Sequence, residues 1–352
     1  MPGHDTPLIA TIAAGFMLAF LFGMIAHRLR LSPLVGYLAA GIVVGPFTPG
    51  FVADAKLAQE LAEMGVILLM FGVGLHFSLA DLMAVRRIAV PGAVAQIGVA
   101  TLLGMALAWA LGWGLGAGLV FGLALSVAST VVLVRALQER KILESERGRI
   151  AVGWLIVEDL VMVLALVLLP ALAPALVADT RLPASEIAAT IGLTLLKVAA
   201  FIGVMVVAGR RVIPWIMHHA AHTGSRELFR LAVYAVALGV AFGAAKLFDV
   251  SFALGAFFAG MMMGESRLSQ RAADEALPLR DAFAVLFFVS VGMLFNPAVL
   301  VEAPLAVLAT VLIIVFGKSV AAFLIVRAFG HPTSTALTVS AALAQIGEFS
   351  FI

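Results

Sequence analysis

Residues 149–172 read Arg149-Ile-Ala-Val-Gly-Trp-Leu-Ile-Val-Glu158-Asp159-Leu-Val-Met-Val-Leu-Ala-Leu-Val-Leu-Leu-Pro-Ala-Leu172. Apart from its two acids, this stretch has the length and apolar content of a membrane-spanning helix. The acids lie near its midpoint, where one charged side chain costs about 3 kcal/mol or more. Two adjacent carboxylates at that depth need a positive partner, a bound cation, protons or water. We therefore expect the other helices to form a polar site around Glu158 and Asp159.

The composition of the whole chain excludes a soluble fold. Of its 352 residues, 63% are hydrophobic and 12% are charged, and the mean hydropathy is +1.14. Soluble domains carry about twice that share of charge. The apolar runs are long and lack the alternation of strands, which predicts an all-α polytopic membrane protein. The chain has no cysteine and no HExxH, P-loop or Gly-x-Ser-x-Gly motif, so we expect no enzyme.

Lysine and arginine positions predict the orientation of the spans. Seventeen of them fall in loops on one side and three on the other, which places the N-terminus outside a bacterial-type inner membrane. This distribution, with a net charge of only +2, indicates a membrane surface and not a nucleic acid. The expected hydrophobic segments number twelve: 7–27, 32–46, 58–77, 88–112, 115–137, 149–172, 186–209, 227–247, 251–265, 280–295, 301–328 and 333–352.

The sequence also repeats itself. The matching stretches are 31–45 with 250–264, 63–78 with 281–296, and 124–130 with 342–348. Equivalent segments are seven spans apart, so the second copy crosses the membrane in the opposite sense, as in many secondary transporters. We expect a first repeat of six spans over 1–172, a linker helix and loops over 173–225, and a second repeat over 226–352. The second repeat has five spans here and lacks a thirteenth.

Three charged positions inside spans are candidates for a site. Glu158 and Asp159 point about 100° apart on a helix, so one can face a packed partner and the other a water-filled cavity. Lys318 lies in the middle of segment 11 and is the expected counter-charge for Glu158 or Asp159. Lys197 lies in the linker helix, outside both repeats, and is expected to be structural or lipid-facing. His218 and His219 are expected in a loop or at the membrane interface.

Segments 5 and 12 carry polar interruptions at matching places, and these predict helices broken at the midplane. Their residues are Ser126, Ser129 and Thr130 in segment 5, and Gln345, Gly347 and Glu348 in segment 12. Unwound backbone at that depth is tolerated only inside the protein or beside a cavity, where freed carbonyls and hydroxyls could coordinate a cation. Glu348 could offset the positive ends of half-helices. The alternative is that the hydroxyls bond back to the carbonyls of an unbroken helix.

The sequence resembles the Kef-type branch of the monovalent cation–proton antiporters, the cation:proton antiporter-2 family. The resemblance rests on residues 33–46, 65–75, 124–131, 286–293 and 344–351, which include PLVGYLAAGIVVGP, GVILLMFGVGL and AQIGEFSF. It implies thirteen spans, two crossed discontinuous helices in a core domain, and a dimerisation domain using segments 1, 2, 8 and 9. It also implies a homodimer and pH homeostasis. A cytosolic nucleotide-binding regulatory domain is implied after the last span, and this sequence contains none of it.

The resemblance also assigns roles to residues. Asp159 matches the ion- and proton-binding aspartate of the family, and Lys318 matches its core lysine. Thr130 and Glu348 match polar residues of the crossing. Glu158 departs from the family pattern, because that position is Asp in electrogenic sodium exchangers and often Gln in Kef-type proteins.

We therefore expect exchange of a monovalent cation, K⁺ or Na⁺, for protons at Asp159 by alternating access. Glu158, Ser129 and Thr130 would help to bind the ion, and no cofactor is expected in this chain. Other classes stay open: a ligand-gated potassium efflux channel, a sodium-coupled or organic-anion symporter of related fold, and a membrane sensor. An intramembrane enzyme is least expected, because no nucleophile–base set is present.

Overall fold

The computed structural model describes residues 7–48, 55–76, 79–143, 145–177, 184–266 and 268–351. All regular secondary structure in these ranges is helical. By length and composition, seven of the described helices could cross a membrane, which confirms the expected polytopic all-α class. These are Leu8–Arg28, Lys56–Leu75, Met83–Ala110, Gly192–His222, Arg226–Phe248, Arg271–Met293 and Pro304–Ala328.

The chain forms two compact units. The first comprises residues 1–77 and 197–301, and the second comprises residues 78–196 and 302–352. The first unit holds the segments expected in a dimerisation domain. The second holds both acids and both segments with polar interruptions, which are expected in a core domain. The repeat boundaries at 172 and 226 stay a prediction.

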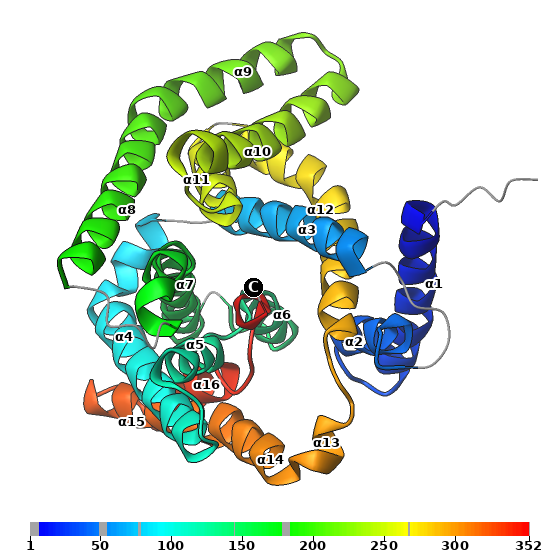
Figure 1. Cartoon of the computed structure of the whole chain (residues 1–352). Helices are drawn as coiled ribbons and strands as arrows, with labels where there is room; N and C mark the ends of the chain where they lie inside the picture. Colours follow the sequence, from blue (N-terminus) through cyan, green and yellow to red (C-terminus); the bar gives the residue numbers. More distant parts are fainter. Residues whose placement is uncertain are drawn as a thin grey trace, which may run out of the picture. The chain divides into compact units, whose positions relative to one another are not determined.

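In the described part of the chain, the first unit contains seven helices and the end of an eighth, which Figure 1 labels. These are α1 (Pro7–Arg28), α2 (Pro33–Val44), α3 (Ala55–His76), α9 (Arg210–His222), α10 (Arg226–Phe248), α11 (Phe252–Gly264) and α12 (Ser269–Met293), with α8 (Ala184–Val204) and the π-helical turn η1 (Met205–Gly209) before α9. The short helices α2 and α11 begin in the same way. Ser32 and Ser251, which are equivalent in the repeat, each accept a hydrogen bond from a backbone N–H of the first turn.

Equivalent glycines of the two repeats make equivalent close contacts in the first unit. Gly41 of α2 lies against the carbonyl oxygen of Val289 on α12, and Gly260 of α11 lies against that of Phe71 on α3. Phe71 and Val289 are themselves equivalent in the repeat. A Cβ at either glycine would overlap the facing backbone, so only glycine permits this helix spacing.

The reciprocal contacts follow the same rule. Gly292 of α12 lies against the carbonyl oxygen of Leu38 on α2, and its equivalent Gly74 of α3 lies against that of Phe257 on α11. The α2–α12 pair and the α3–α11 pair are therefore two copies of one packing arrangement. The weak sequence repeat thus corresponds to a repeated structure, as the inverted-repeat fold requires.

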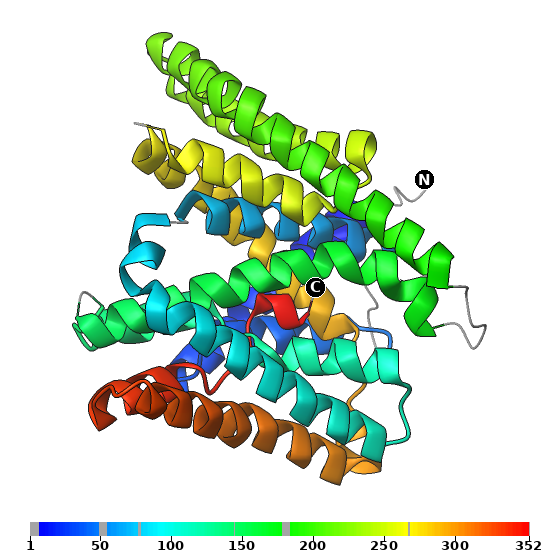
Figure 2. The same ribbon diagram turned by 90° about the vertical axis from the view of Figure 1, so that its left-hand side faces the viewer.

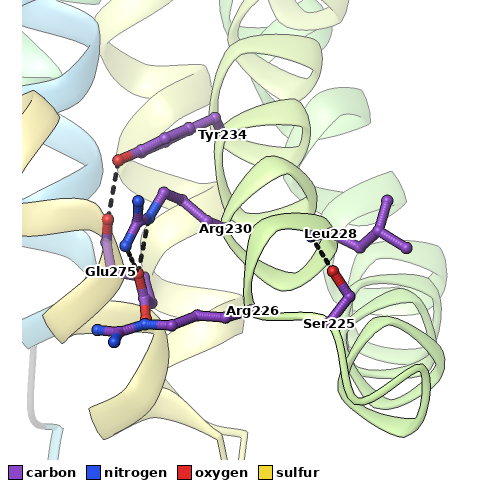
Figure 3. A network of polar contacts seen from close by, with 6 residues as sticks. All are labelled: Ser225, Arg226, Leu228, Arg230, Tyr234 and Glu275. Carbon is purple, nitrogen blue, oxygen red and sulfur yellow. Dashed lines mark hydrogen bonds and ion pairs between the residues drawn. The ribbon is translucent and has the colours of Figure 1, made fainter.

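A buried carboxylate joins α10 to α12 in the same unit (Figure 3). Glu275 is 4% exposed, and its two side-chain oxygens accept hydrogen bonds from Nε of Arg226 at 2.6 Å and Nε of Arg230 at 2.7 Å. The hydroxyl of Tyr234 donates to the Glu275 backbone carbonyl at 2.8 Å. Two guanidinium groups compensate the one carboxylate, as a buried charge requires. This network ties the N-terminal part of α10 to that of α12.

The second unit contains both predicted breaks. Its elements are α4 (Leu79–Ala110), α5 (Leu115–Ser126), α6 (Thr130–Glu139), α7 (Glu146–Val177), α14 (Pro304–Leu312), the π-helical turn η2 (Ile313–Gly317), α15 (Lys318–Ala328), α16 (Thr333–Ala342) and the 3₁₀ turn η3 (Glu348–Ser350), with α13 (Val299–Glu302) at its boundary. Helices α4, α5 and α7 pack against one another, and α15 packs against α4 and α16 (Figures 1 and 2).

Some helix ends differ from the predicted ones. The loop expected after residue 209 is wrong for Arg210–His222, because η1 leads directly into α9, which carries His218 and His219. Helix α12 begins at Ser269 and not near residue 280. An apolar run marks the part of a helix suited to hydrocarbon. The helix can continue beyond that part because its backbone hydrogen bonds are internal.

Candidate functional site

Both predicted breaks are present in the second unit. Helix α5 ends at Ser126, and α6 begins at Thr130 after three non-helical residues, of which Val127 is extended. Helix α16 ends at Ala342, and five non-helical residues separate it from η3. This confirms the discontinuous helices expected in segments 5 and 12.

The two breaks lie against each other through Gln345. Its Oε1 accepts a hydrogen bond from the N–H of Ser129 at 2.9 Å, and its Nε2 donates to the carbonyl of the same residue at 3.1 Å. Gly347 packs so closely on the backbone of Ala128 and Ser129 that a Cβ would crowd it. The hydroxyl of Ser350 donates to the carbonyl of Ala124 at 2.6 Å. These contacts hold the crossing together.

Lys318 links the carbonyl groups of both breaks. It follows η2 directly, and its side chain is fully buried. Nζ donates to the carbonyl of Val127 at 3.0 Å and to that of Gln345 at 2.8 Å. Both carbonyls follow the C-terminal ends of helices, where the dipoles concentrate negative charge. The charge of Lys318 interacts with that of Glu158.

Glu158 binds the backbone of the α5–α6 break just before the start of α6. It is fully buried, and its Oε2 accepts a hydrogen bond from the N–H of Ala128 at 2.9 Å. That N–H precedes the start of α6, where a helix dipole favours negative charge. Lys318 and Glu158 therefore bind the two sides of one peptide group, the carbonyl of Val127 and the N–H of Ala128, which reduces the cost of burying each of them.

Asp159 reaches the same break two residues further along. It is 5% exposed, and its Oδ2 accepts a hydrogen bond from the hydroxyl of Thr130 at 2.9 Å. The two adjacent acids of α7 thus take different partners, as their rotation on a helix requires. Asp159 faces a side-chain oxygen, whereas Glu158 faces the backbone. A carboxylate beside a hydroxyl supplies oxygen atoms of the kind that hard cations prefer.

Some predicted residues have other contacts. The hydroxyl of Ser126 bonds back to the carbonyl of Leu123 at 2.7 Å, so the local alternative holds at this position. The hydroxyl of Ser129 accepts from the N–H of Val132 at 3.4 Å and caps α6. The side chain of Glu348 lies outside the described residues.

Lys197 belongs to the first unit and not to this site. Its Nζ lies 3.0 Å from Oδ2 of Asp249, and both side chains are substantially exposed. An exposed ion pair of this kind is worth little for stability. The contact agrees with the structural role expected for Lys197.

Sequence reasoning missed two residues beside the site. Gln96 on α4 is fully buried, and its Nε2 donates to the carbonyl of Ser126 at 3.0 Å. Trp154 on α7 is fully buried one turn before Glu158. The rule that singled out Lys318, a polar side chain in the middle of a span, would also have found Gln96.

Crossed helix breaks with buried carboxylates and a buried lysine, in an all-helical membrane protein, define the class of secondary transporters with discontinuous helices. The chain belongs to the sodium/hydrogen exchanger family, whose transmembrane profile matches residues 16–352. Membership of this family confirms the expected class, a transporter and not an enzyme.

Sequence similarity to known relatives covers most of the length of this chain. It is 68% identical to YbaL of Escherichia coli K12, a predicted cation/proton antiporter, over 99% of this chain and 62% of YbaL. It is 36% identical to K⁺ efflux antiporter 4 of Arabidopsis thaliana, over 94% of this chain and 55% of that protein. The chain thus spans a little over half the length of these relatives.

A solved structure has the same fold. The sodium proton antiporter MjNhaP1 from Methanocaldococcus jannaschii superposes with a TM-score of 0.69, over 96% of this chain and 84% of that chain. The two are 16% identical, so the likeness concerns the fold alone. It confirms the predicted antiporter-type fold with an inverted repeat.

Proposed function

We propose that this protein exchanges a monovalent cation, K⁺ or Na⁺, for protons at Asp159 by alternating access. The observation that carries the proposal is the pairing of Asp159 with Thr130 at the α5–α6 break. Asp159 is buried in the middle of a span and faces the one place in α5–α6 where the backbone is unwound. A carboxylate at that depth is tolerable if one positive ligand replaces another.

The cation would bind to oxygen atoms at the break. Asp159 supplies a carboxylate, and Thr130 and Ser129 supply hydroxyl oxygens. Membership of the exchanger family supports a cation/proton antiporter. The name of the Arabidopsis relative favours K⁺, and that of the solved structure favours Na⁺.

The proton would compete for the same carboxylate. When Asp159 is ionised, it attracts the cation. When a proton binds to Asp159, the carboxyl group is neutral and the cation leaves. Glu158 is less suited to this exchange, because its Oε2 holds the N–H of Ala128 and its charge is balanced by Lys318. In this proposal Glu158 and Lys318 keep the break open, and Gln345 and Gly347 hold the crossing.

The setting of the protein is part of the proposal. The chain is a multi-pass membrane protein, and the charge distribution over its loops supports an inner membrane with the N-terminus outside. We infer a homodimer through the first unit. The relatives are longer than this chain, which leaves room in the full-length protein for the expected nucleotide-binding regulatory domain.

Proton flux in proteoliposomes tests the proposal. The full-length protein is reconstituted with a trapped pH indicator, and Na⁺, K⁺, Li⁺, Rb⁺ or choline is added outside. We expect saturable proton movement with at least one alkali cation and none with choline. Cation flux that is not coupled to protons would favour a channel instead, and a requirement for an organic anion would favour a symporter.

A further inference from the structure

Four buried side-chain atoms have no hydrogen-bond partner among the described residues, and all lie on α4 and α7. They are Oε1 of Gln96, Oγ1 of Thr101, Nε1 of Trp154 and Oε1 of Glu158. Buried polar atoms are almost always satisfied in folded proteins, by protein groups or by water. These unpartnered atoms all lie on two neighbouring helices beside the crossing, so they require a common explanation.

The packing of α4 on α7 brings together the helix segments that carry three of these atoms. Gly153 of α7 packs on Val85 of α4, and one to two turns further along α4, Gly92 packs on the ring of Trp154. The ring of Trp154 therefore lies against α4 one turn before Gln96. One more turn on each helix leads from Gly92 to Gln96 and from Trp154 to Glu158.

The partners of Gln96 and Glu158 support the same placement. Gln96 binds the carbonyl of Ser126 at 3.0 Å, and Glu158 binds the N–H of Ala128 at 2.9 Å. These backbone groups are two residues apart in the α5–α6 break. The indole N–H of Trp154 lies beside the Glu158 carboxylate, but the two groups do not meet the geometry of a hydrogen bond.

We propose that Gln96, Trp154 and Glu158 hold one internal water molecule behind the crossing, and that Gln96 is thereby a positioning residue of the exchange site. The unpartnered atoms of the three residues are two acceptors and one donor. A water molecule donates two hydrogen bonds and accepts others, so one molecule satisfies all three. It would donate to Gln96 and Glu158 and accept from Trp154.

This water would fix the Glu158 carboxylate against the break. Glu158 faces the ammonium of Lys318 on α15 and adjoins Asp159 on α7, while α4 contributes the neutral amide of Gln96 and the break contributes the N–H of Ala128. The water site stands on the geometry, whereas the positioning role rests on the proposed exchange function.

A structure of the full-length protein in lipid nanodiscs, at a resolution that shows ordered water, tests the site directly. We expect density within about 3 Å of all three atoms, the usual hydrogen-bond distance. Direct hydrogen bonds among Gln96, Trp154 and Glu158, or an empty gap between them, would overturn the water site. This result does not depend on whether the protein exchanges cations.

A pair of variants on α4 tests the positioning role. Gln96→Met keeps the size of the side chain and removes its polar atoms, and Thr101→Val is the matched control, because the Thr101 hydroxyl has no partner among the described residues. We expect Gln96→Met to shift the cation concentration for half-maximal exchange upward about ten-fold with little change in the maximal rate, because the α5–α6 break beside Asp159 loses the hydrogen bond from Gln96 to the Ser126 carbonyl and the contact with the water. We expect Thr101→Val to leave that concentration unchanged. Equal shifts, or none, in two folded variants would contradict the positioning role. Absence of exchange in the wild type would instead contradict the proposed function.

Discussion

Thr130 donates a hydrogen bond from its hydroxyl to Oδ2 of Asp159 at 2.9 Å. Thr130 is the first residue of α6, and Asp159 lies in the middle of α7. The contact therefore joins the end of the unwound segment to a buried acid in the middle of a span. Its neighbour Glu158 holds the N–H of Ala128 in the same segment. The break and the two acids thus form one polar unit inside a membrane-spanning protein.

Thr130→Val should weaken cation binding while the protein stays folded. The change removes a hydroxyl from the proposed ligand set and a hydrogen bond to a carboxylate, which is worth about 1.5–3 kcal/mol. We expect the cation concentration for half-maximal exchange to rise about ten-fold or more. The matched control is Thr310→Val, whose hydroxyl bonds back to the carbonyl of Ala306 on α14. Unchanged cation dependence in Thr130→Val would exclude Thr130 as a ligand.

Two replacements of Lys318 should distinguish the effect of its charge on exchange from the effect of its hydrogen bonds on stability. Lys318→Gln keeps a donor for one of the two carbonyls, so we expect a folded protein with a changed pH profile or charge stoichiometry. Lys318→Met leaves the carbonyls of Val127 and Gln345 without this donor, at about 1–3 kcal/mol each. We therefore expect a clear loss of thermal stability for Lys318→Met in detergent. Lys246→Met, at an exposed position, is the control, and equal melting temperatures for the two methionine variants would refute the structural part of this account.

Equivalent glycines should respond equally to substitution. A Cβ at Gly41 or Gly260 meets a backbone carbonyl, so Gly41→Ala and Gly260→Ala should each destabilise the protein by about 1–3 kcal/mol. Gly243→Ala on α10 is the control, because a Cβ there has open space around it. Thermal unfolding of the purified full-length variants measures the effect. A Gly260→Ala protein as stable as Gly243→Ala would argue against the close packing of α11 on α3.

The sequence indicated the helix breaks and the importance of the two acids, because both depart from the uniform apolar pattern of a membrane span. Charged residues do not stay in hydrocarbon without a partner, and polar residues with glycine at repeat-related places interrupt a uniform apolar pattern. Glu158, Asp159, Lys318 and Gln345 stood out for this reason. Gln345 shows the limit of the inference, because its two hydrogen bonds to Ser129 cross 216 residues of chain.

Other contacts could not be predicted, because backbone atoms carry no sequence signal. Lys318 was expected to face an acid, yet its hydrogen bonds go to the carbonyls of Val127 and Gln345. Helix α7 is apolar on all sides, so its pattern does not say which face meets α4 or where Gln96 lies. Helix α9 was missed because a polar stretch after a span looks like a loop in a hydropathy pattern.

Proton flux with Asp159→Asn tests the central claim most directly. The full-length variant is reconstituted in proteoliposomes beside the wild type and beside Asp249→Asn, a change at an exposed left-handed position that asparagine tolerates. Melting temperatures establish that all three are folded. We predict that Asp159→Asn has no cation-dependent proton flux, while Asp249→Asn exchanges at the wild-type rate. Cation-dependent exchange at the wild-type rate in Asp159→Asn would contradict the account.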